Sequence, residues 1–373
     1  MSPPHNGTGI SLPIMSYRRY SEEVNLGRLP SLPNCPHQAA KPGYTDWMTM
    51  PRHDNFNICL SCYEKVFANT GFRNQFVPAR HRPPNKPIAC DFGTSPWYRI
   101  AWLMTRKHGY PDLRLMHGIA TVASMTDPCR GNHLSSRVWY SIRHPRFRSG
   151  IPDFGVCYQC AQSVEALFPN LRGIFVPPEQ PEPTRDVCAL HFAPGRNRFG
   201  LYFDLLESAS DRAQRTQSAP DIRLLADKVL QLSELDECSR DEPVRGAAWY
   251  VMERLPDFTV CPECFHDVVY PQLVDGGGGG VGGGGGNAVA RNFFQKPQWL
   301  HESSCQLYSD RMREVFRAAC RTGDMRLLED TLRERGKKEA EAMRKLAKID
   351  RSMTAEASGE EAERVLREWK RWE

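Results

Sequence analysis

The hydrophobic pattern of this chain repeats three times in the same order. Each copy begins with a tryptophan followed by aromatic, β-branched or long apolar residues, which is typical of a short strand. These segments are residues 47–50, 139–142 and 249–252. A second apolar run follows, then a helix-compatible stretch, a phenylalanine close to a proline, and an amphipathic helix. Because self-similar segments fold as similar units, the pattern predicts three units of one design.

Each second apolar run ends in two cysteines of a CxxC motif, with a phenylalanine three residues before the first. The pairs are Cys59 and Cys62, Cys157 and Cys160, and Cys261 and Cys264. A helix-compatible stretch begins directly after each pair. The closing amphipathic helices are expected at 97–106, 198–208 and 309–320, with Ser309 as the N-cap of the third.

Two further cysteines flank every pair. The upstream cysteine precedes the pair by 24, 28 and 23 residues, and the downstream cysteine follows it by 28, 28 and 41. A glycine run at 276–286 accounts for most of the longer last spacing, because surface loops lengthen at little entropic cost. The flanking residues are Cys35, Cys129 and Cys238 upstream, and Cys90, Cys188 and Cys305 downstream. Of the 13 cysteines, only Cys320 falls outside this order, and we expect it in the core.

The sequence therefore predicts an α+β fold of three small zinc-stabilised units, each built from short strands, a CxxC knuckle and a closing helix. The expected organisation is a disordered N-terminus at 1–16, four-cysteine units at 17–110, 111–215 and 216–332, and a charged helical tail at 333–373. The tail is expected to form one or two amphipathic helices, because apolar residues recur there at three- or four-residue steps.

Four cysteines per unit match the donor set of a structural Zn²⁺ site, which is a closed tetrahedron of thiolates. We therefore expect three structural Zn²⁺ ions, with the twelve cysteines of the repeat as ligands. Histidines near the sets are alternative ligands, and a surface or capping role is favoured for them because four cysteines already fill the shell. These histidines are His37, His133, His191 and His266.

Two other interpretations of the cysteines remain open. A strand followed by CxxC and a helix is also the order of thioredoxin-like redox sites, in which the helix N-terminus lowers the pKa of one thiol. Such a site needs no outer cysteines, whereas every pair here has two. Buried free cysteine acting as a small apolar residue explains single positions, but it does not explain a threefold order.

Charge is distributed unevenly along the chain, whose net charge is +5. Residues 1–110 carry 13 Lys and Arg against 6 Asp and Glu, whereas residues 201–310 carry 9 against 17. In the second unit, the span between the tryptophan segment and the CxxC pair is six residues longer than in the first. This span is rich in arginine: Arg137, Arg143, Arg146 and Arg148. Arginines beside an aromatic residue can contact phosphates and stack on bases, so nucleic-acid binding competes with a merely solvated basic loop.

Compartment and chemistry are constrained by what the sequence does not contain. No apolar run approaches the roughly 20 residues that span a bilayer, and no basic start followed by an apolar run resembles a signal peptide. We therefore expect an intracellular protein of the cytoplasm or nucleus, neither secreted nor bound to membranes. Paired carboxylates, a Ser/His/Asp order, a P-loop and a Rossmann glycine signature are missing, so we expect no enzymatic activity.

Three segments resemble an uncharacterised family of filamentous-ascomycete proteins over about residues 17–332. They are residues 90–97 (CDFGTSPW), 255–261 (LPDFTVC) and 304–309 (SCQLYS). The resemblance implies a fungal source and adds no mechanism. The sequence favours a non-enzymatic zinc-binding scaffold for a protein partner. Nucleic-acid binding through the basic loops of the first two units is the alternative, and CxxC thiol–disulfide chemistry is the second alternative.

Overall fold

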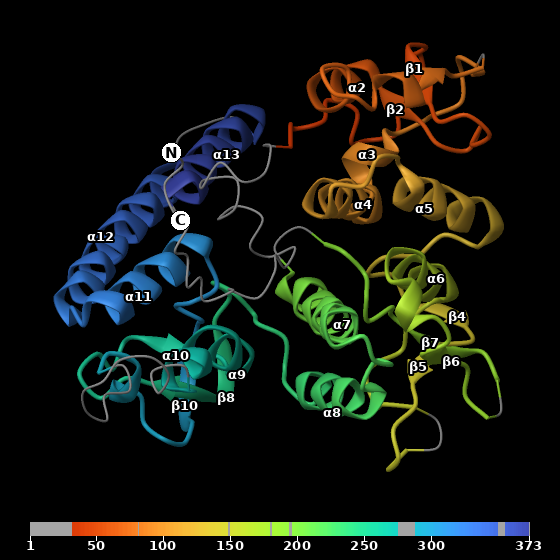
Figure 1. The fold of residues 1–373 in the computed structure, drawn as a ribbon. Coiled ribbons are helices and arrows are strands. Elements are labelled where there is room, and N and C mark those ends of the chain that lie inside the picture. Colours follow the sequence, from red (N-terminus) through yellow and green to blue (C-terminus); the bar gives the residue numbers. More distant parts are fainter. Residues whose placement is uncertain are drawn as a thin grey trace, which may run out of the picture. The chain divides into compact units, whose positions relative to one another are not determined.

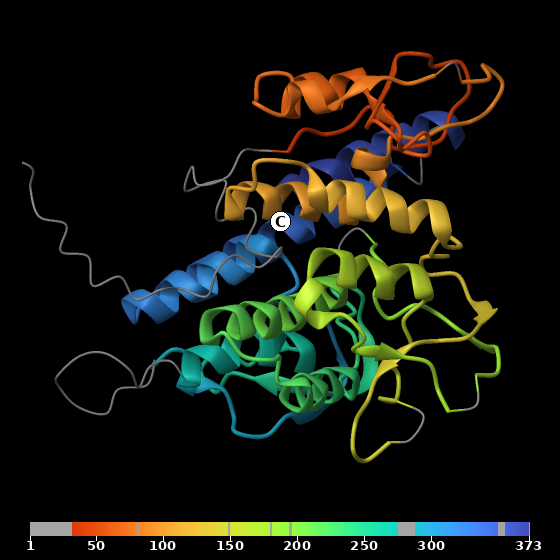
Figure 2. The same ribbon diagram turned by 45° about the vertical axis from the view of Figure 1, so that its right-hand side comes forward.

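The computed structural model describes residues 32–80, 82–147, 150–179, 181–193, 196–274, 288–349 and 355–372. The chain divides into two compact units, Met1–Glu234 and Leu235–Glu373, and each is described here by itself (Figure 1, Figure 2). The expected disordered N-terminus at 1–16 and the glycine run at 276–286 lie outside the described residues.

The first unit contains two copies of the repeat. Its first copy comprises β1 (Trp47–Thr49), β2 (Ile58–Cys59), α2 (Leu60–Val66), η2 (Arg73–Gln75), β3 (Val77–Pro78), α3 (Asp91–Thr94) and α4 (Pro96–His108). Helix α5 (Arg114–Met125) leads into the second copy. The second copy comprises β4 (Ser135–Arg137), β5 (Ser141–Ile142), α6 (Tyr158–Leu167), η3 (Pro169–Leu171), β6 (Phe175–Val176), β7 (Thr184–Asp186) and α7 (Asn197–Thr216), and α8 (Ile222–Ser233) ends the unit.

The second unit holds the third copy and the C-terminal helices. Its elements are β8 (Val244–Val251), β9 (Thr259–Val260), α9 (Pro262–Cys264), η4 (Phe265–Val269), α10 (Tyr270–Val274), η6 (Ala290–Asn292), β10 (Gln298–Ser303), α11 (Asp310–Thr322), α12 (Met325–Ile349) and α13 (Ala355–Trp372). The antiparallel pair of β8 and β10 is a longer version of the pair of β4 and β7 in the second copy. Short strands and helices in alternation agree with the expected mixed fold.

The three copies share one strand register. The residue after each tryptophan pairs with the residue before the first cysteine of the CxxC motif: Met48 with Ile58, Tyr140 with Val156, and Tyr250 with Val260. The other edge of the tryptophan strand pairs with the segment of the Phe–Pro step, as in Thr49 with Val77 and Ser141 with Val176. The predicted strands are therefore confirmed as a small antiparallel sheet that delivers each CxxC pair from a fixed position.

An aromatic contact joins the CxxC strand to the closing helix in every copy. The phenylalanine three residues before the pair packs against a ring of that helix: Phe56 on Tyr98, Phe154 on Tyr202, and Phe258 on Phe316. All six rings are buried. The ring centroids lie 4.7, 4.7 and 6.2 Å apart. Burial of such large rings supplies much of the stabilisation that strands of two or three residues cannot provide.

The first two copies share one hydrophobic core, whereas the third has a core of its own. Helix α5 packs against both α4 and α6 and so bridges the first two copies. Across the same core, the Trp97 ring of α4 meets the Phe199 ring of α7 at 5.5 Å. The first two copies therefore form a single packed body.

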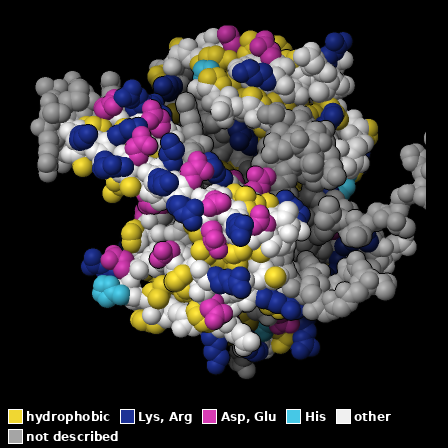
Figure 3. Space-filling view, turned by 90° about the vertical axis from the view of Figure 1, so that its left-hand side faces the viewer, with side chains coloured by type: hydrophobic (Ala, Val, Ile, Leu, Met, Phe, Trp, Pro, Cys, Tyr) yellow, Lys and Arg dark blue, Asp and Glu magenta, His cyan; other side chains and the backbone are white. Residues whose placement is uncertain are grey.

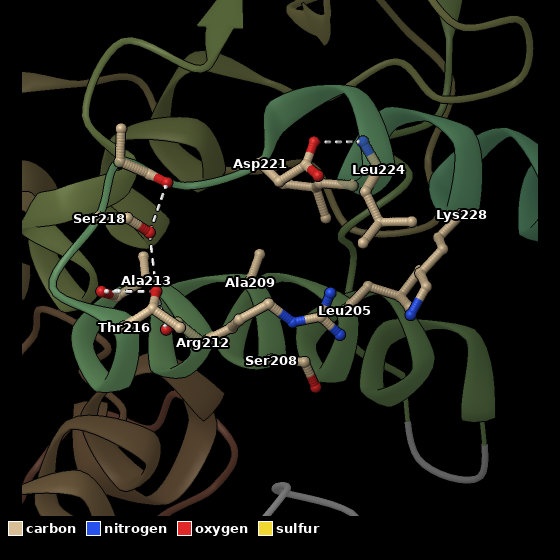
Figure 4. A pocket seen from close by; sticks show the side chains of 12 residues that line it. Leu205, Ser208, Ala209, Arg212, Ala213, Thr216, Ser218, Asp221, Leu224 and Lys228 are labelled. Carbon is tan, nitrogen blue, oxygen red and sulfur yellow. Dashed lines mark hydrogen bonds between the residues drawn. The ribbon is translucent and has the colours of Figure 1, made fainter.

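Helix α8 belongs to the first unit, although the expected boundary after residue 215 places it in the third repeat. It packs against α7, and the two helices flank a cavity of about 300 Å³ (Figure 4). Asp221 caps α8 by accepting a hydrogen bond from the Leu224 N–H at 2.9 Å. The apolar face of α8, including Leu225 and Val229, is buried in the core of the first unit. This packing cannot be read from a cysteine repeat.

The C-terminal tail forms two helices, but the helical region begins earlier than residue 333. Gly323 ends α11 in the left-handed conformation with φ of 68°, and α12 starts at Met325. The break is therefore set by a glycine C-cap. Helix α13 packs on α12 and buries Val365. Basic and acidic side chains are interspersed over the face that includes α12 (Figure 3), as in the pair of Lys345 with Glu341 at 3.1 Å.

No helix among the described residues is both long enough and apolar enough to cross a membrane.

A buried ion cluster links α4 to α7 within the first unit. The Lys107 ammonium lies 2.7 Å from Glu207 and 3.4 Å from Asp211, and the side chains of Lys107 and Glu207 are only 6% and 5% exposed. Burial raises the pKa of Glu207 to about 7, against the opposing effect of Lys107. Because water does not reach this cluster, removing one charged side chain would leave the opposite charge buried without a partner.

Lys107→Met is expected to lower the free energy of unfolding of the first unit by about 3–5 kcal/mol, because two carboxyl groups then lose their buried counter-charge. Hydrogen–deuterium exchange of the α4 and α7 amides measures the effect locally. Arg114→Met is the control, since it removes an exposed ion pair with Asp112 and a cation–π contact with Tyr110, and neither partner lies in α4 or α7. Equal protection of α4 and α7 in the two variants would contradict the assigned role.

Candidate metal centres

The structure brings the twelve cysteines of the repeat together in three groups of four. Within each group all four Sγ atoms lie within 4.8 Å of one another, so each group could hold a metal ion. The groups have the membership that the sequence order gives: Cys35, Cys59, Cys62 and Cys90; Cys129, Cys157, Cys160 and Cys188; and Cys238, Cys261, Cys264 and Cys305. None of the 13 cysteines is in a disulfide. Ten of the twelve are buried, and Cys129 and Cys238 are half-buried.

The first cysteine of each CxxC motif occupies the N-cap of a helix. Cys59, Cys157 and Cys261 precede α2, α6 and α9 with φ of −70°, −68° and −66° and ψ of 151°, 154° and 158°. The same backbone conformation three times places the second sulfur one helical turn from the first. A helix N-terminus also favours a negatively charged sulfur, because unpaired N–H groups point toward it.

The upstream cysteine of each group sits in a tight turn. Its sulfur accepts a hydrogen bond from the backbone N–H two residues later: His37 to Cys35 at 3.3 Å, and Arg240 to Cys238 at 3.4 Å. The Gly131 N–H acts in the same way on Cys129. Such N–H donors stabilise a thiolate more than a neutral thiol.

The downstream cysteine is held by a backbone bond that is also common to the three copies. The N–H of the following residue donates to the carbonyl two residues before the CxxC motif. These bonds are Asp91 to Asn57 at 2.8 Å, Ala189 to Gly155 at 2.7 Å, and Gln306 to Thr259 at 2.8 Å. In the first two groups the downstream sulfur also accepts a bond from the N–H of the first CxxC cysteine, at 3.4 Å in each. The downstream cysteine is thereby held next to the strand that carries the CxxC pair.

The sulfurs of each group share hydrogen bonds, and this separates their pKa values. Hydrogen bonds from neighbouring thiols, led by Cys62, lower the pKa of Cys59 to about 2. The same cause lowers the pKa of Cys129 and of Cys238. Hydrogen bonding to the ionised neighbour raises the pKa of Cys62 and Cys160. In each group the shared hydrogen bonds thus favour a thiolate at one sulfur and a retained proton at another.

A close backbone approach makes room for the first group. Helix α3 begins directly after Cys90, and Gly93 is its third residue. A Cβ atom on Gly93 would lie 2.5 Å from both Cβ and Sγ of Cys35. Real Cβ contacts do not come so close, so any larger residue would displace Cys35. The repeat pattern could not reveal this glycine, because His191 and Tyr308 occupy the same offset in the other copies.

The third group differs by a charged donor. The Arg313 guanidinium of α11 donates to Cys264 Sγ at 3.2 Å and to Asp267 at 3.1 Å. Burial opposes its charge, yet Cys264 and Asp267 raise the pKa of Arg313 above its ordinary value. Sequence reasoning missed Arg313, because 49 residues separate it from Cys264.

The candidate histidine ligands lie outside the groups, which consist of cysteines alone in the described part of the chain. The His37 ring packs on Tyr44 at 4.0 Å, and His191 Nδ1 lies 2.8 Å from the Cys188 carbonyl oxygen. The His266 ring lies 5.8 Å from the Tyr270 ring, and the His133 N–H donates to the Arg130 carbonyl. Cys320 is buried in the core of the second unit as expected.

The structure describes three of the four arginines that were predicted to contact nucleic acid. The guanidinium of Arg137 lies over the Trp139 ring at 5.9 Å, and that of Arg146 lies over the Phe147 ring at 5.4 Å. Arg143 lines a groove in the first unit. Arg148 lies outside the described residues.

Comparisons with known proteins returned no match from protein-family models, from curated proteins or from solved structures. The resemblance to filamentous-ascomycete proteins stays a prediction.

Gly93→Ala is expected to push Cys35 out of the first group. Overpacking of this kind costs about 1–3 kcal/mol, which corresponds to roughly 5- to 150-fold faster alkylation of Cys35 through local opening. Iodoacetamide labelling followed by peptide mass spectrometry measures the rate at each cysteine. Gly71→Ala is the matched control, because a Cβ there meets nothing within 4 Å. Unchanged labelling of Cys35 in Gly93→Ala would refute the close approach.

Proposed function

We propose that the protein binds three structural zinc ions, one in each four-cysteine group. The observation that carries the proposal is the convergence of four sulfurs within 4.8 Å of one another in every copy. Zn²⁺ takes four thiolates in a tetrahedron with Zn–S distances of about 2.3 Å, and such a tetrahedron needs sulfurs this close. Soft thiolate ligands also suit iron, so the identity of the metal is part of the test.

A structural role for the ions is favoured by the closed ligand set. Catalytic zinc sites keep one position open for water or substrate, whereas four cysteines fill the tetrahedron. The helix N-cap position of Cys59, Cys157 and Cys261 would equally suit a redox pair. Two further sulfurs beside every pair favour metal binding over thiol–disulfide exchange, which needs only two.

Structural ions would hold together segments that have little secondary structure of their own. Strands β2 and β9 have two residues each, and the flanking cysteines lie in loops. Structural zinc contributes on the order of 10–16 kcal/mol to the folding of small peptides, because the site exists only in the folded state. The metal ions would therefore be part of the fold of each copy.

We extend the proposal to a non-enzymatic scaffold that binds a protein partner. Exposed apolar side chains support a binding surface on the second unit: Trp299 on the edge strand β10 is 75% exposed, and Met343 on α12 is 63% exposed. Single exposed apolar residues are common on protein surfaces, so the partner stays a prediction.

Elemental analysis and native mass spectrometry of protein purified without added metal test the zinc proposal. We expect three zinc ions per chain, and two in each of the variants Cys62→Ser, Cys160→Ser and Cys264→Ser. Cys320→Ser is the control and should keep three.

If a variant does not fold, the proposal can still be tested by measuring the thiol reactivity of the wild-type protein. Twelve of its 13 thiols should react with a thiol reagent only after a strong chelator is added. A folded, metal-free protein whose grouped thiols all react at once would overturn the proposal.

A further inference from the structure

A groove in the first unit lies apart from the cysteine groups. It has a volume of about 650 Å³ and lies between the loop after β5, the segment after β6, and α8. Its lining includes Arg143, His144, Phe147, Gly150, Glu179 and Arg223. Prolines 145, 177 and 178 stiffen its walls.

The groove is built by an insertion that the other copies lack. Twelve residues separate the tryptophan from the first CxxC cysteine in the first and third copies, and 18 separate them in the second. The extra residues form the loop that carries Arg143, Arg146 and Phe147. The strand register and the cysteine geometry are the same without them, so the fold of the copy does not require this loop. Loops positioned by a rigid scaffold are a usual place for binding residues.

Two arginines face the groove from distant segments. Arg143 belongs to the loop and Arg223 to α8, and both side chains are exposed. Within the described part of the chain, neither makes an ion pair or a side-chain hydrogen bond. Glu179 also lines the groove and offsets part of their charge. A guanidinium presents a planar fork that matches two phosphate oxygens, which makes phosphate the preferred anion.

A cation–π pair lies in the same loop: Phe147 lines the groove, and Arg146 precedes it in the chain. Phe147 is half-buried, and the Arg146 guanidinium lies 5.4 Å from its ring centroid. Phenylalanine rings and guanidinium planes are the surfaces on which unpaired bases stack. The groove therefore combines phosphate donors with a stacking surface.

The loop is fixed at both ends, so the groove exists before a ligand binds. The Arg146 N–H donates to Nδ1 of buried His144 at 3.2 Å, which leaves the ring proton on Nε2. Nε2 then donates to the Asp227 carboxylate of α8 at 2.9 Å. At the other end Gly150 has φ of +94° and packs so closely on Ser141 that a Cβ would lie 2.5 Å away. Such preorganisation reduces the entropy lost on binding.

We propose that this groove binds a single-stranded nucleic-acid segment, with Arg143 and Arg223 on its phosphates and the Arg146–Phe147 pair against a base. The charge of the unit favours this occupant, since residues 1–234 carry 27 Lys and Arg against 19 Asp and Glu. The site uses none of the grouped cysteines, so it is independent of the zinc proposal except through the fold of the unit.

Fluorescence anisotropy with labelled single-stranded DNA and RNA oligonucleotides, in 50 mM and 200 mM salt, tests the proposal. Binding should weaken as salt rises. Arg143→Ala and Arg223→Ala should each raise Kd at 50 mM salt about tenfold or more, because each loses a charge-assisted hydrogen bond. Phe147→Leu should raise Kd for the oligonucleotide about fivefold or more, and it should leave the Kd of inorganic tripolyphosphate unchanged.

Arg172→Ala is the charge-matched control, because Arg172 is exposed in the same unit and does not line the groove. It should change Kd little at either salt concentration. An equal loss in Arg172→Ala would mean attraction by net charge alone, and no binding at 50 mM salt would refute the site. An unchanged oligonucleotide Kd in Phe147→Leu would mean a general anion groove and would overturn the assignment. The metal content of each variant, measured in parallel, separates these outcomes from loss of the cysteine sites.

Discussion

The gathering of four thiol sulfurs within 4.8 Å in every copy is the constraint on which the rest of the structure depends. Thiolates so close together repel one another and are poorly hydrated when buried, so the arrangement needs a compensating cation or shared protons. The same three backbone features occur in every copy. The first CxxC cysteine is a helix N-cap, and a backbone N–H two residues after the upstream cysteine donates to its sulfur. A backbone hydrogen bond also joins the downstream loop to the CxxC strand. Strands of two or three residues then suffice in the first two copies, because the cysteine-bearing loops are hydrogen-bonded to them.

The copies differ in what surrounds this common frame. Gly93 lets Cys35 approach the first group, and Arg313 adds a buried charge-assisted donor to the third. The second copy instead carries an inserted loop, which His144 fastens to α8 through Asp227. One architecture thus provides three different surroundings for a four-cysteine group and one additional groove. The strand register and the N-cap cysteine are nevertheless the same in all three copies.

The repeat was sufficient to predict which twelve cysteines meet, the strand before each CxxC pair and the helix after it. These features depend on spacing, and spacing is visible in the sequence. Contacts between distant residues could not be predicted, because no local pattern marks them: Arg313 reaches Cys264, and α8 joins the first unit through Leu225 and Val229. The early start of α12 follows from the glycine cap at Gly323, which a change in composition near residue 333 does not reveal. The glycine run, the N-terminal segment and Arg148 lie outside the described residues, so the predictions made for them stand as predictions.

X-ray absorption at the zinc K-edge of the purified full-length protein tests the central claim most directly. We predict that each zinc has four sulfur neighbours at about 2.3 Å, because every group offers four thiolates. A shell of nitrogen or oxygen at about 2.0–2.2 Å would mean that a histidine, carboxylate or water completes the site, and it would contradict the four-thiolate assignment.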